Sequence, residues 1–262
     1  MNNWLHELPL PLMALVVFGL TFLITFAIQR AIAALATGER AKSFKAVSPG
    51  MLPPLGIIFG LFVAFTAAQV WSDNDHANAA IDREASALRA AMLLGANFPG
   101  DVQQRLTNLL RAYISDAASR EWPAMADRSA DLRSPPLPLV DALQLALSLK
   151  PDGAGAVAAQ RDMATALQTA LDARRQRILI SHAGVNGVKW SCLALQALCA
   201  LFAIGLVHSD NRLASTLALG LFATGIAASV LLIAAHDRPF VGQLALNPEP
   251  LLQVLPEAGK KP

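Results

Sequence analysis

Four long apolar segments constrain this chain more than any other feature of its sequence. They cover residues 10–28, 51–70, 190–207 and 213–235, and none contains Asp, Glu, Lys or Arg. A helix needs about 20 residues to cross a hydrocarbon layer of about 30 Å, and the segments hold 19, 20, 18 and 23. Because lipid offers no hydrogen-bond partners, such segments must form helices. The sequence therefore predicts four transmembrane helices. The alternative is a soluble helical protein with unusually apolar helices, which gives no reason for all four segments to reach membrane length.

The composition agrees with a membrane protein that has a sizeable soluble part. Hydrophobic residues make up 54% of the chain and charged residues 15%, whereas ordinary soluble domains carry about 25% charged residues. The net charge of +2 and the lack of a basic stripe with interleaved aromatics predict no nucleic-acid partner. Cys192 and Cys199 lie about 10 Å apart along one predicted helix, too far to form a disulfide with each other. The expected partner is the lipid bilayer.

The predicted fold is an all-α membrane protein in which two hairpins of transmembrane helices flank a helical soluble domain. Alanine and leucine dominate the soluble block, β-branched residues are few, and Gly/Pro clusters mark its breaks. We expect Trp122-Pro123 to end one of its helices. The expected segments are transmembrane helices at 8–36, 51–71, 189–208 and 213–235, the soluble domain at 72–188, and a tail at 236–262 that docks on the soluble domain.

The distribution of cations leaves the orientation in the membrane open. Five cations lie near the spans on the side of the short hairpin turns: Arg30, Arg40, Lys42, Lys45 and Arg212. Seven lie near the spans on the side of the soluble block: Arg83, Arg89, Arg174, Arg175, Arg177, Lys189 and Arg238. Since the positive-inside rule counts mainly short loops, this near-balance does not decide which side is cytoplasmic.

Signatures of catalysis and of cofactor binding are absent from the sequence. It contains no H-E-x-x-H, G-x-S-x-G, P-loop or paired C-x-x-C motif, so we predict no enzyme, no cofactor and no metal. Asp73, Asp75 and His76 form a cluster in which Asp73 and His76 would share a helix face and could share a cation, but we expect a solvated collar at the end of the span instead. No span contains a charge, which argues against an ion-coupled carrier and leaves a channel possible.

The second apolar segment carries the most specific pattern. Gly56 and Gly60 form a G-x-x-x-G step, which lets another helix approach closely, and Pro53 stands at the start of the helix. Ile57, Leu61 and Phe65 recur every four residues and therefore share one face. Such a face either packs on other helices or, in a ring of subunits, lines a hydrophobic constriction.

A second motif directly follows the fourth apolar segment. Asp237 and Arg238 can hydrogen-bond exposed backbone groups or pair with charges of the soluble block, Pro239 ends the helix, and Gly242 permits a tight turn. Together with Phe240 they predict a docked, rigid tail, with a binding site as the alternative.

These motifs resemble those of a known family. Residues 54–63, with Trp71 at the exit, resemble the second spanning helix of bestrophins, and the element from Asp237 to Gly242 resembles the acidic-Pro-Phe-Gly element after their fourth span. Further motifs, at 48–50, 121–126 and 248–251, resemble an uncharacterised bacterial bestrophin-like family across nearly the whole chain. The resemblance implies a pentameric ion channel of the bacterial inner membrane with a cytoplasmic soluble block. It also implies that Ile57 and Leu61 form a hydrophobic neck.

The chain departs from the bestrophin pattern at the calcium site. The acidic run that holds calcium in animal bestrophins is missing, because Asp237 has no neighbouring acids, so calcium gating is not expected. Two functions remain open. One is a homo-oligomeric channel for a permeant ion, with Pro53, Ile57, Leu61 and Phe65 along its pore. The other is a non-conducting scaffold or sensor whose soluble domain binds a partner.

Overall fold

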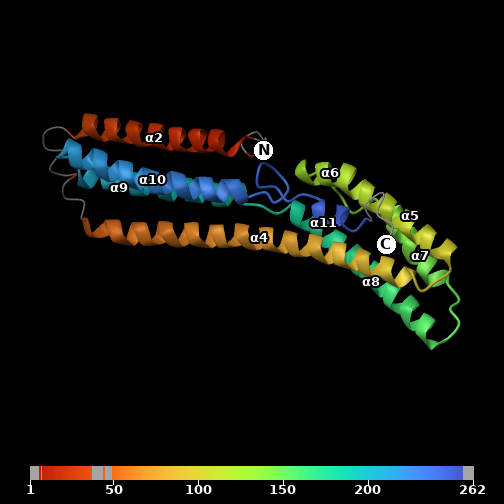
Figure 1. Cartoon of the computed structure of the whole chain (residues 1–262). Coiled ribbons are helices and arrows are strands. Elements are labelled where there is room, and N and C mark those ends of the chain that lie inside the picture. Colours follow the sequence, from red (N-terminus) through yellow and green to blue (C-terminus); the bar gives the residue numbers. More distant parts are fainter. Residues whose placement is uncertain (1–5, 7, 37–43, 45–48, 256–262) are drawn as a thin grey trace. The chain divides into compact units, whose positions relative to one another are not determined.

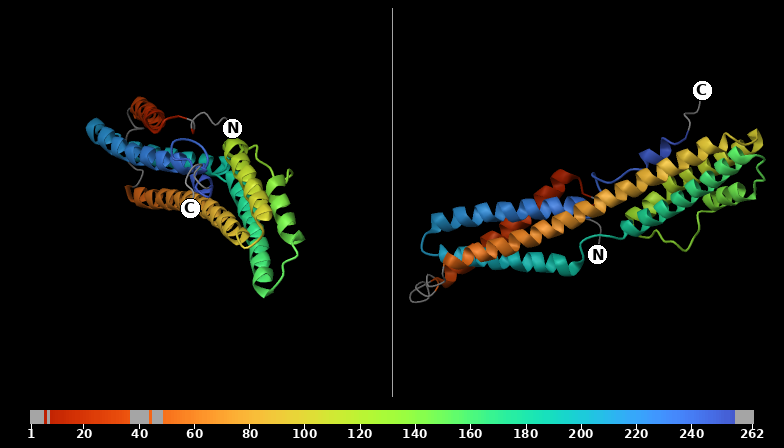
Figure 2. Two further views of the ribbon diagram at one scale, coloured as in Figure 1. Left: turned by 45° about the vertical axis from the view of Figure 1, so that its right-hand side comes forward. Right: turned by 90° about the horizontal axis from the view of Figure 1, so that it is seen from below.

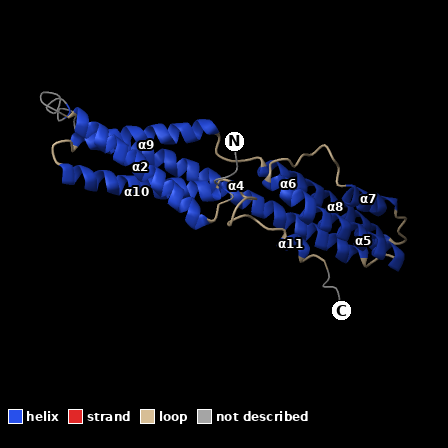
Figure 3. Ribbon diagram, turned by 90° about the horizontal axis from the view of Figure 1, so that it is seen from above, coloured by secondary structure: helices blue, strands red, loops and turns tan. Residues whose placement is uncertain are grey.

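The computed structural model describes residues 6, 8–36, 44 and 49–255. Within these ranges the regular elements are helical and no strand occurs (Figure 3). The long helices are α2 (Leu10–Leu35), α4 (Leu52–Gly95), α5 (Gly100–Asp116), α7 (Leu137–Ser148), α8 (Ala154–Ser181), α9 (Gly187–Val207) and α10 (Arg212–His236). Short helical segments are η1 (Pro49–Met51), η2 (Ala117–Glu121), α6 (Trp122–Ala126) and α11 (Glu249–Leu252). The predicted all-α fold with four membrane-length apolar helices is confirmed.

The chain divides into two compact units. The membrane unit comprises residues 1–72, 184–238 and 242–244, and the soluble unit comprises residues 73–183, 239–241 and 245–262. In the membrane unit α2, α9 and α10 lie side by side (Figures 1 and 2). Gly205 of α9 faces Ile32 of α2 so closely that a side chain at this position would collide with it. The glycine therefore permits close packing of these two helices.

Asparagine side chains cap the two helices of the second hairpin. The Asn211 side chain accepts hydrogen bonds of 3.1 Å from the backbone N–H groups of Leu213 and Ala214, at the start of α10. Asn186 accepts one of 2.9 Å from Lys189 N–H, at the start of α9. Because the first amides of a helix have no partner within it, these side chains fix where each helix begins.

Leucine-rich faces form the core of the soluble unit. Side chains from α4, α5, α7 and α8 that are at most 1% exposed include Leu88, Leu106, Leu110, Leu139 and Leu167. The faces follow the three-to-four-residue spacing of buried helix positions. This core surrounds the polar groups described below.

Helix α4 continues without interruption from the membrane unit into the soluble unit. It holds 44 residues, which corresponds to about 66 Å of α-helix. Between Gly60 and Gly95 the sequence contains neither glycine nor proline, so nothing in it breaks the helix.

The expectation that Trp122-Pro123 ends a helix is wrong. Helix α5 passes through the π-helical turn η2 directly into α6, with Pro123 in the first turn of α6. The Trp122 N–H donates to the carbonyl of Ala117, five residues back. Pro123 directly follows the π-helical turn, where the regular i to i−4 hydrogen-bond pattern that a proline would break is already interrupted.

Candidate functional site

One face of α4 in the membrane unit carries large apolar side chains that the described residues leave exposed. The side chains of Ile57, Leu61 and Phe65, which we call the α4 ridge, are 62%, 52% and 72% exposed. The opposite face carries Phe59 and Val70, which are buried, and Phe59 packs on Phe222 of α10 with ring centroids 5.8 Å apart. The α4 ridge therefore points away from the helices of its own membrane unit.

A row of small residues runs beside the α4 ridge. It consists of Gly56, Gly60, Ala64 and Ala68, four residues apart, and we call it the small-residue row. A β-carbon placed on Gly56 or Gly60 would meet nothing within 4 Å. No described side chain packs on this G-x-x-x-G step as Ile32 packs on Gly205, although Gly56 lines a recess together with Ala200 of α9 and Phe222 of α10. Pro53, the remaining predicted pore residue, is exposed in the first turn of α4.

The membrane-unit half of the tail motif ties three chain segments together. Asp237 is 5% exposed; its Oδ1 accepts a 2.5 Å hydrogen bond from Val185 N–H, and its Oδ2 lies 3.5 Å from His6 Nε2. Gly242 adopts a φ of +89°, and a β-carbon there would lie 2.6 Å from the His6 carbonyl oxygen. Only glycine meets both demands without strain. Arg238 beside them is half-buried.

The other half of the tail motif belongs to the soluble unit. Phe240 is buried and packs edge-on against Trp122 at 5.9 Å between ring centroids. The Leu246 N–H donates to the Pro239 carbonyl at 2.7 Å, and Trp122 Nε1 donates to the Leu246 carbonyl at 2.9 Å. These contacts show that Phe240 belongs to a packed segment.

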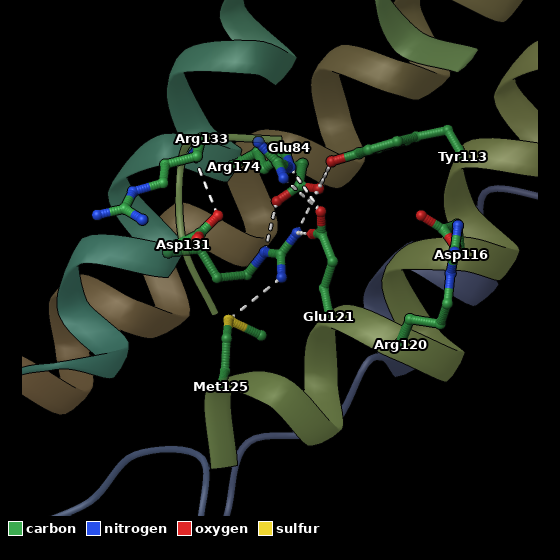
Figure 4. Close-up of polar contacts among 10 residues, drawn as sticks. Glu84, Tyr113, Asp116, Arg120, Glu121, Met125, Asp131, Arg133 and Arg174 are labelled. Atoms are coloured by element: carbon green, nitrogen blue, oxygen red, sulfur yellow. Dashed lines mark hydrogen bonds and ion pairs between the residues drawn. The ribbon is translucent and has the colours of Figure 1, made fainter. Parts of the chain in front are cut away.

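The soluble unit encloses a network of charges that the sequence did not reveal as a site. We call Glu84, Glu121, Arg174, Arg177 and Tyr113 the charge network (Figure 4). Glu84 and Arg177 are fully buried, with Arg177 Nε donating to Glu84 Oε2 at 2.8 Å and Nη2 donating to Oε1 at 3.1 Å. Tyr113 O–H donates a short hydrogen bond to the same Glu84 Oε1.

Glu121, which lies in the π-helical turn η2, supplies the second negative charge of the charge network. It accepts from Arg177 Nη2 at 3.0 Å and from Arg174 Nε at 2.7 Å. The two acids and two arginines cancel, as buried charges must if they are to stay ionised. The Arg177 guanidinium also lies 4.5 Å from the Trp122 ring centroid, a cation–π distance. Glu121 is the last residue of η2.

Burial and neighbouring charges shift the pKa values of two of these groups. Burial raises the pKa of the Tyr113 phenol well above its ordinary value, and the negative charge of Glu84 adds to the shift. For Arg177, burial alone would lower the pKa, but the Glu84 and Glu121 carboxylates outweigh it and the pKa is raised. Tyr113 therefore stays neutral and Arg177 charged throughout the physiological range.

The structure gathers no metal site among its described residues. No group of three or more His, Cys, Asp or Glu side chains there is arranged to hold an ion. On α4, Asp73 is half-buried, whereas Asp75 and His76 are exposed; the solvated collar stays a prediction. The charged groups of the charge network form hydrogen bonds with one another.

Together these features define a membrane protein with four membrane-length helices and a helical soluble unit built around internal ion pairs. The family model described as the bestrophin-like domain matches residues 19–251. The chain belongs to the bestrophin-like family. Searches of curated proteins and of solved structures returned no match.

Proposed function

We propose that this protein is a homo-oligomeric ion channel of the bacterial inner membrane, with α4 around the pore and the soluble unit in the cytoplasm. The observation that carries the proposal is the exposed α4 ridge beside a small-residue row on which no described side chain packs closely. Family membership supports it, since bestrophins form channels in this way. A pentamer is the assembly we expect.

The two rows of α4 suit the two contacts that a pore helix makes in a ring. A row of glycines and alanines lets the neighbouring copy's backbone approach, and the ridges of one helix fill the grooves of the next. The α4 ridge would then face the shared axis. Ile57 and Leu61 would form a neck that excludes water when narrow and conducts when widened.

Conductance in planar bilayers tests this proposal. Ile57→Ser replaces an apolar neck side chain by a small polar one and is expected to raise single-channel conductance, because it lowers the cost of wetting the neck. Ile58→Ser is the matched control: Ile58 is 54% exposed at the same depth but turned about 100° away, so it should leave conductance unchanged. Purified protein that carries no current, with or without Ile57→Ser, would refute the channel.

The second candidate is a non-conducting scaffold or sensor that binds a partner through its soluble unit. Exposed leucines at both ends of α7, Leu137 at 63% and Leu147 at 61%, are the observation that favours it. A strictly monomeric particle, in detergent and in nanodiscs, would support this function and contradict the channel.

A further inference from the structure

The hairpin-turn end of the membrane unit holds a small recess with a cationic, hydroxyl-rich wall. We call it the arginine recess; its volume is about 240 Å³. The polar side chains that line it are Gln29, Arg30, Ser209, Arg212, Ser215 and Thr216. They come from the last turns of α2, the turn after α9 and the first turns of α10. No carboxylate lines it, so the recess is suited to an anion.

The lengths of the apolar helices place the two arginines at the expected edge of the hydrocarbon layer. Arg30 follows the start of α2 at Leu10 by 20 residues, which is about 30 Å of helix, the thickness of a hydrocarbon core. Arg212 directly precedes the apolar part of α10. Both side chains are exposed, and neither forms an ion pair with another described residue.

Hydrogen bonds hold the wall of the arginine recess in place. Gln29 Nε2 donates to Thr216 Oγ1 at 2.6 Å, which joins α2 to α10. Thr216 Oγ1 donates to the Arg212 carbonyl at 2.8 Å. The Asn211 side chain already occupies the amides of Leu213 and Ala214. The available donors are therefore the guanidinium groups and the serine hydroxyls, rather than the bare end of a helix.

We propose that the arginine recess binds the phosphate of an anionic phospholipid. A guanidinium presents paired N–H donors that match phosphate oxygens, and it loses less hydration than an ammonium on doing so. Phe26, which is 59% exposed, lines the same recess one turn deeper in the membrane, where the acyl chains of a bound lipid would lie. Inorganic phosphate shares the headgroup chemistry but has no acyl chains. The site is independent of whether the protein conducts.

Lipid retention measured by native mass spectrometry tests this inference. The full-length protein is taken from nanodiscs of phosphatidylcholine containing a minority of phosphatidylglycerol, and the retained lipids are identified. The expected result is selective retention of phosphatidylglycerol. Arg30→Gln or Arg212→Gln should each weaken it about three- to tenfold, the effect of one charged hydrogen bond at an exposed site. Excess inorganic phosphate should not displace the lipid.

A charge-matched variant separates a site from general surface charge. Arg89→Gln removes one positive charge from an exposed position of α4 in the soluble unit and should leave retention unchanged. Equal loss in Arg89→Gln and Arg30→Gln would overturn the proposal, as would wild-type retention in both recess variants, Arg30→Gln and Arg212→Gln. Displacement of the lipid by inorganic phosphate would show that the recess binds a free anion and would overturn the proposal of a lipid site. Unchanged melting temperatures would show that the arginine variants are folded.

Discussion

Removing Arg177 should destabilise the protein more than any other single loss of charge. Arg177→Met keeps a long apolar stem but leaves Glu84 fully buried with the Tyr113 hydroxyl as its remaining hydrogen-bond donor in the charge network. Glu84 loses both guanidinium hydrogen bonds, whereas Glu121 keeps Arg174. Breaking a buried pair in this way costs about 3–5 kcal/mol, because an uncompensated charge remains.

The expected cost corresponds to a measurable shift in melting temperature. For a protein of this size, 1 kcal/mol changes the melting temperature by about 2–4 °C, so Arg177→Met should melt about 10 °C below the wild type. Tryptophan fluorescence of the full chain in detergent, at one fixed scan rate, reports the transition. Arg175→Met is the matched control, since Arg175 is exposed on the same helix and its loss should cost no more than about 0.5 kcal/mol.

A double variant distinguishes lost pairing from lost packing. Glu84→Leu combined with Arg177→Met removes both buried charges, and replacing such a pair by apolar side chains is often close to neutral. It should therefore recover most of the stability lost in Arg177→Met, as a coupling between the two sites. The reasoning is refuted if Arg177→Met melts with the wild type, or if the double variant melts no higher than Arg177→Met.

Two further predictions concern Tyr113 and the small-residue row. Tyr113 is the single tyrosine of the chain, and its pKa is raised by burial and by Glu84. The folded state therefore holds the phenolic proton more tightly than the unfolded state. This stability is present below about pH 10 and is lost as the pH rises through the folded value. Tyrosinate absorbance should accordingly appear only with unfolding, and reversible ionisation near pH 10 in folded protein would contradict the assignment. Gly60→Leu should shift the particle to monomer on size exclusion with light scattering, because it fills the small-residue row. Gly19→Leu on α2, where a β-carbon also meets nothing, should leave assembly intact; equal assembly in both variants would argue against the row as a contact.

The membrane part of the fold could be predicted because length and composition alone specify it. Four charge-free segments of bilayer length have one stable conformation in lipid, and four membrane-length helices are what the structure contains. The path through Trp122-Pro123 could not be predicted in the same way. A proline rule describes a regular α-helix, whereas the π-helical turn supplies Trp122 with a carbonyl five residues back.

The spacing of residues along the sequence indicates that members of the charge network are buried, although their charged residue types suggest exposed positions. On α4, buried positions recur three or four residues apart at Ala77, Ile81, Glu84, Leu88 and Ala91. Glu84 thus occupies a core position of an otherwise apolar stripe. On α8, Arg174 and Arg177 continue the stripe of Met163, Leu167 and Ala170 in the same way. A charge at a core position is costly unless it is paired, so the stripes indicate buried charges. Sequence spacing does not reveal which acid meets which arginine, since that pairing depends on how three helices pack.

The exposed α4 ridge alone would not require a partner, because lipid tails are as apolar as leucine and provide no hydrophobic force between helices. The arrangement of its two rows is more informative. Residues four apart form four rows around a helix, so the small-residue row lies about a quarter-turn from the α4 ridge. In a two-fold pair, the direction to the neighbour and the direction to the axis coincide, and one row would serve both. In a ring they diverge, and each direction needs its own surface. A helix with separate small and bulky rows therefore suits the proposed ring, in which close approach to the neighbouring copy would turn Ile57 and Leu61 toward a common centre.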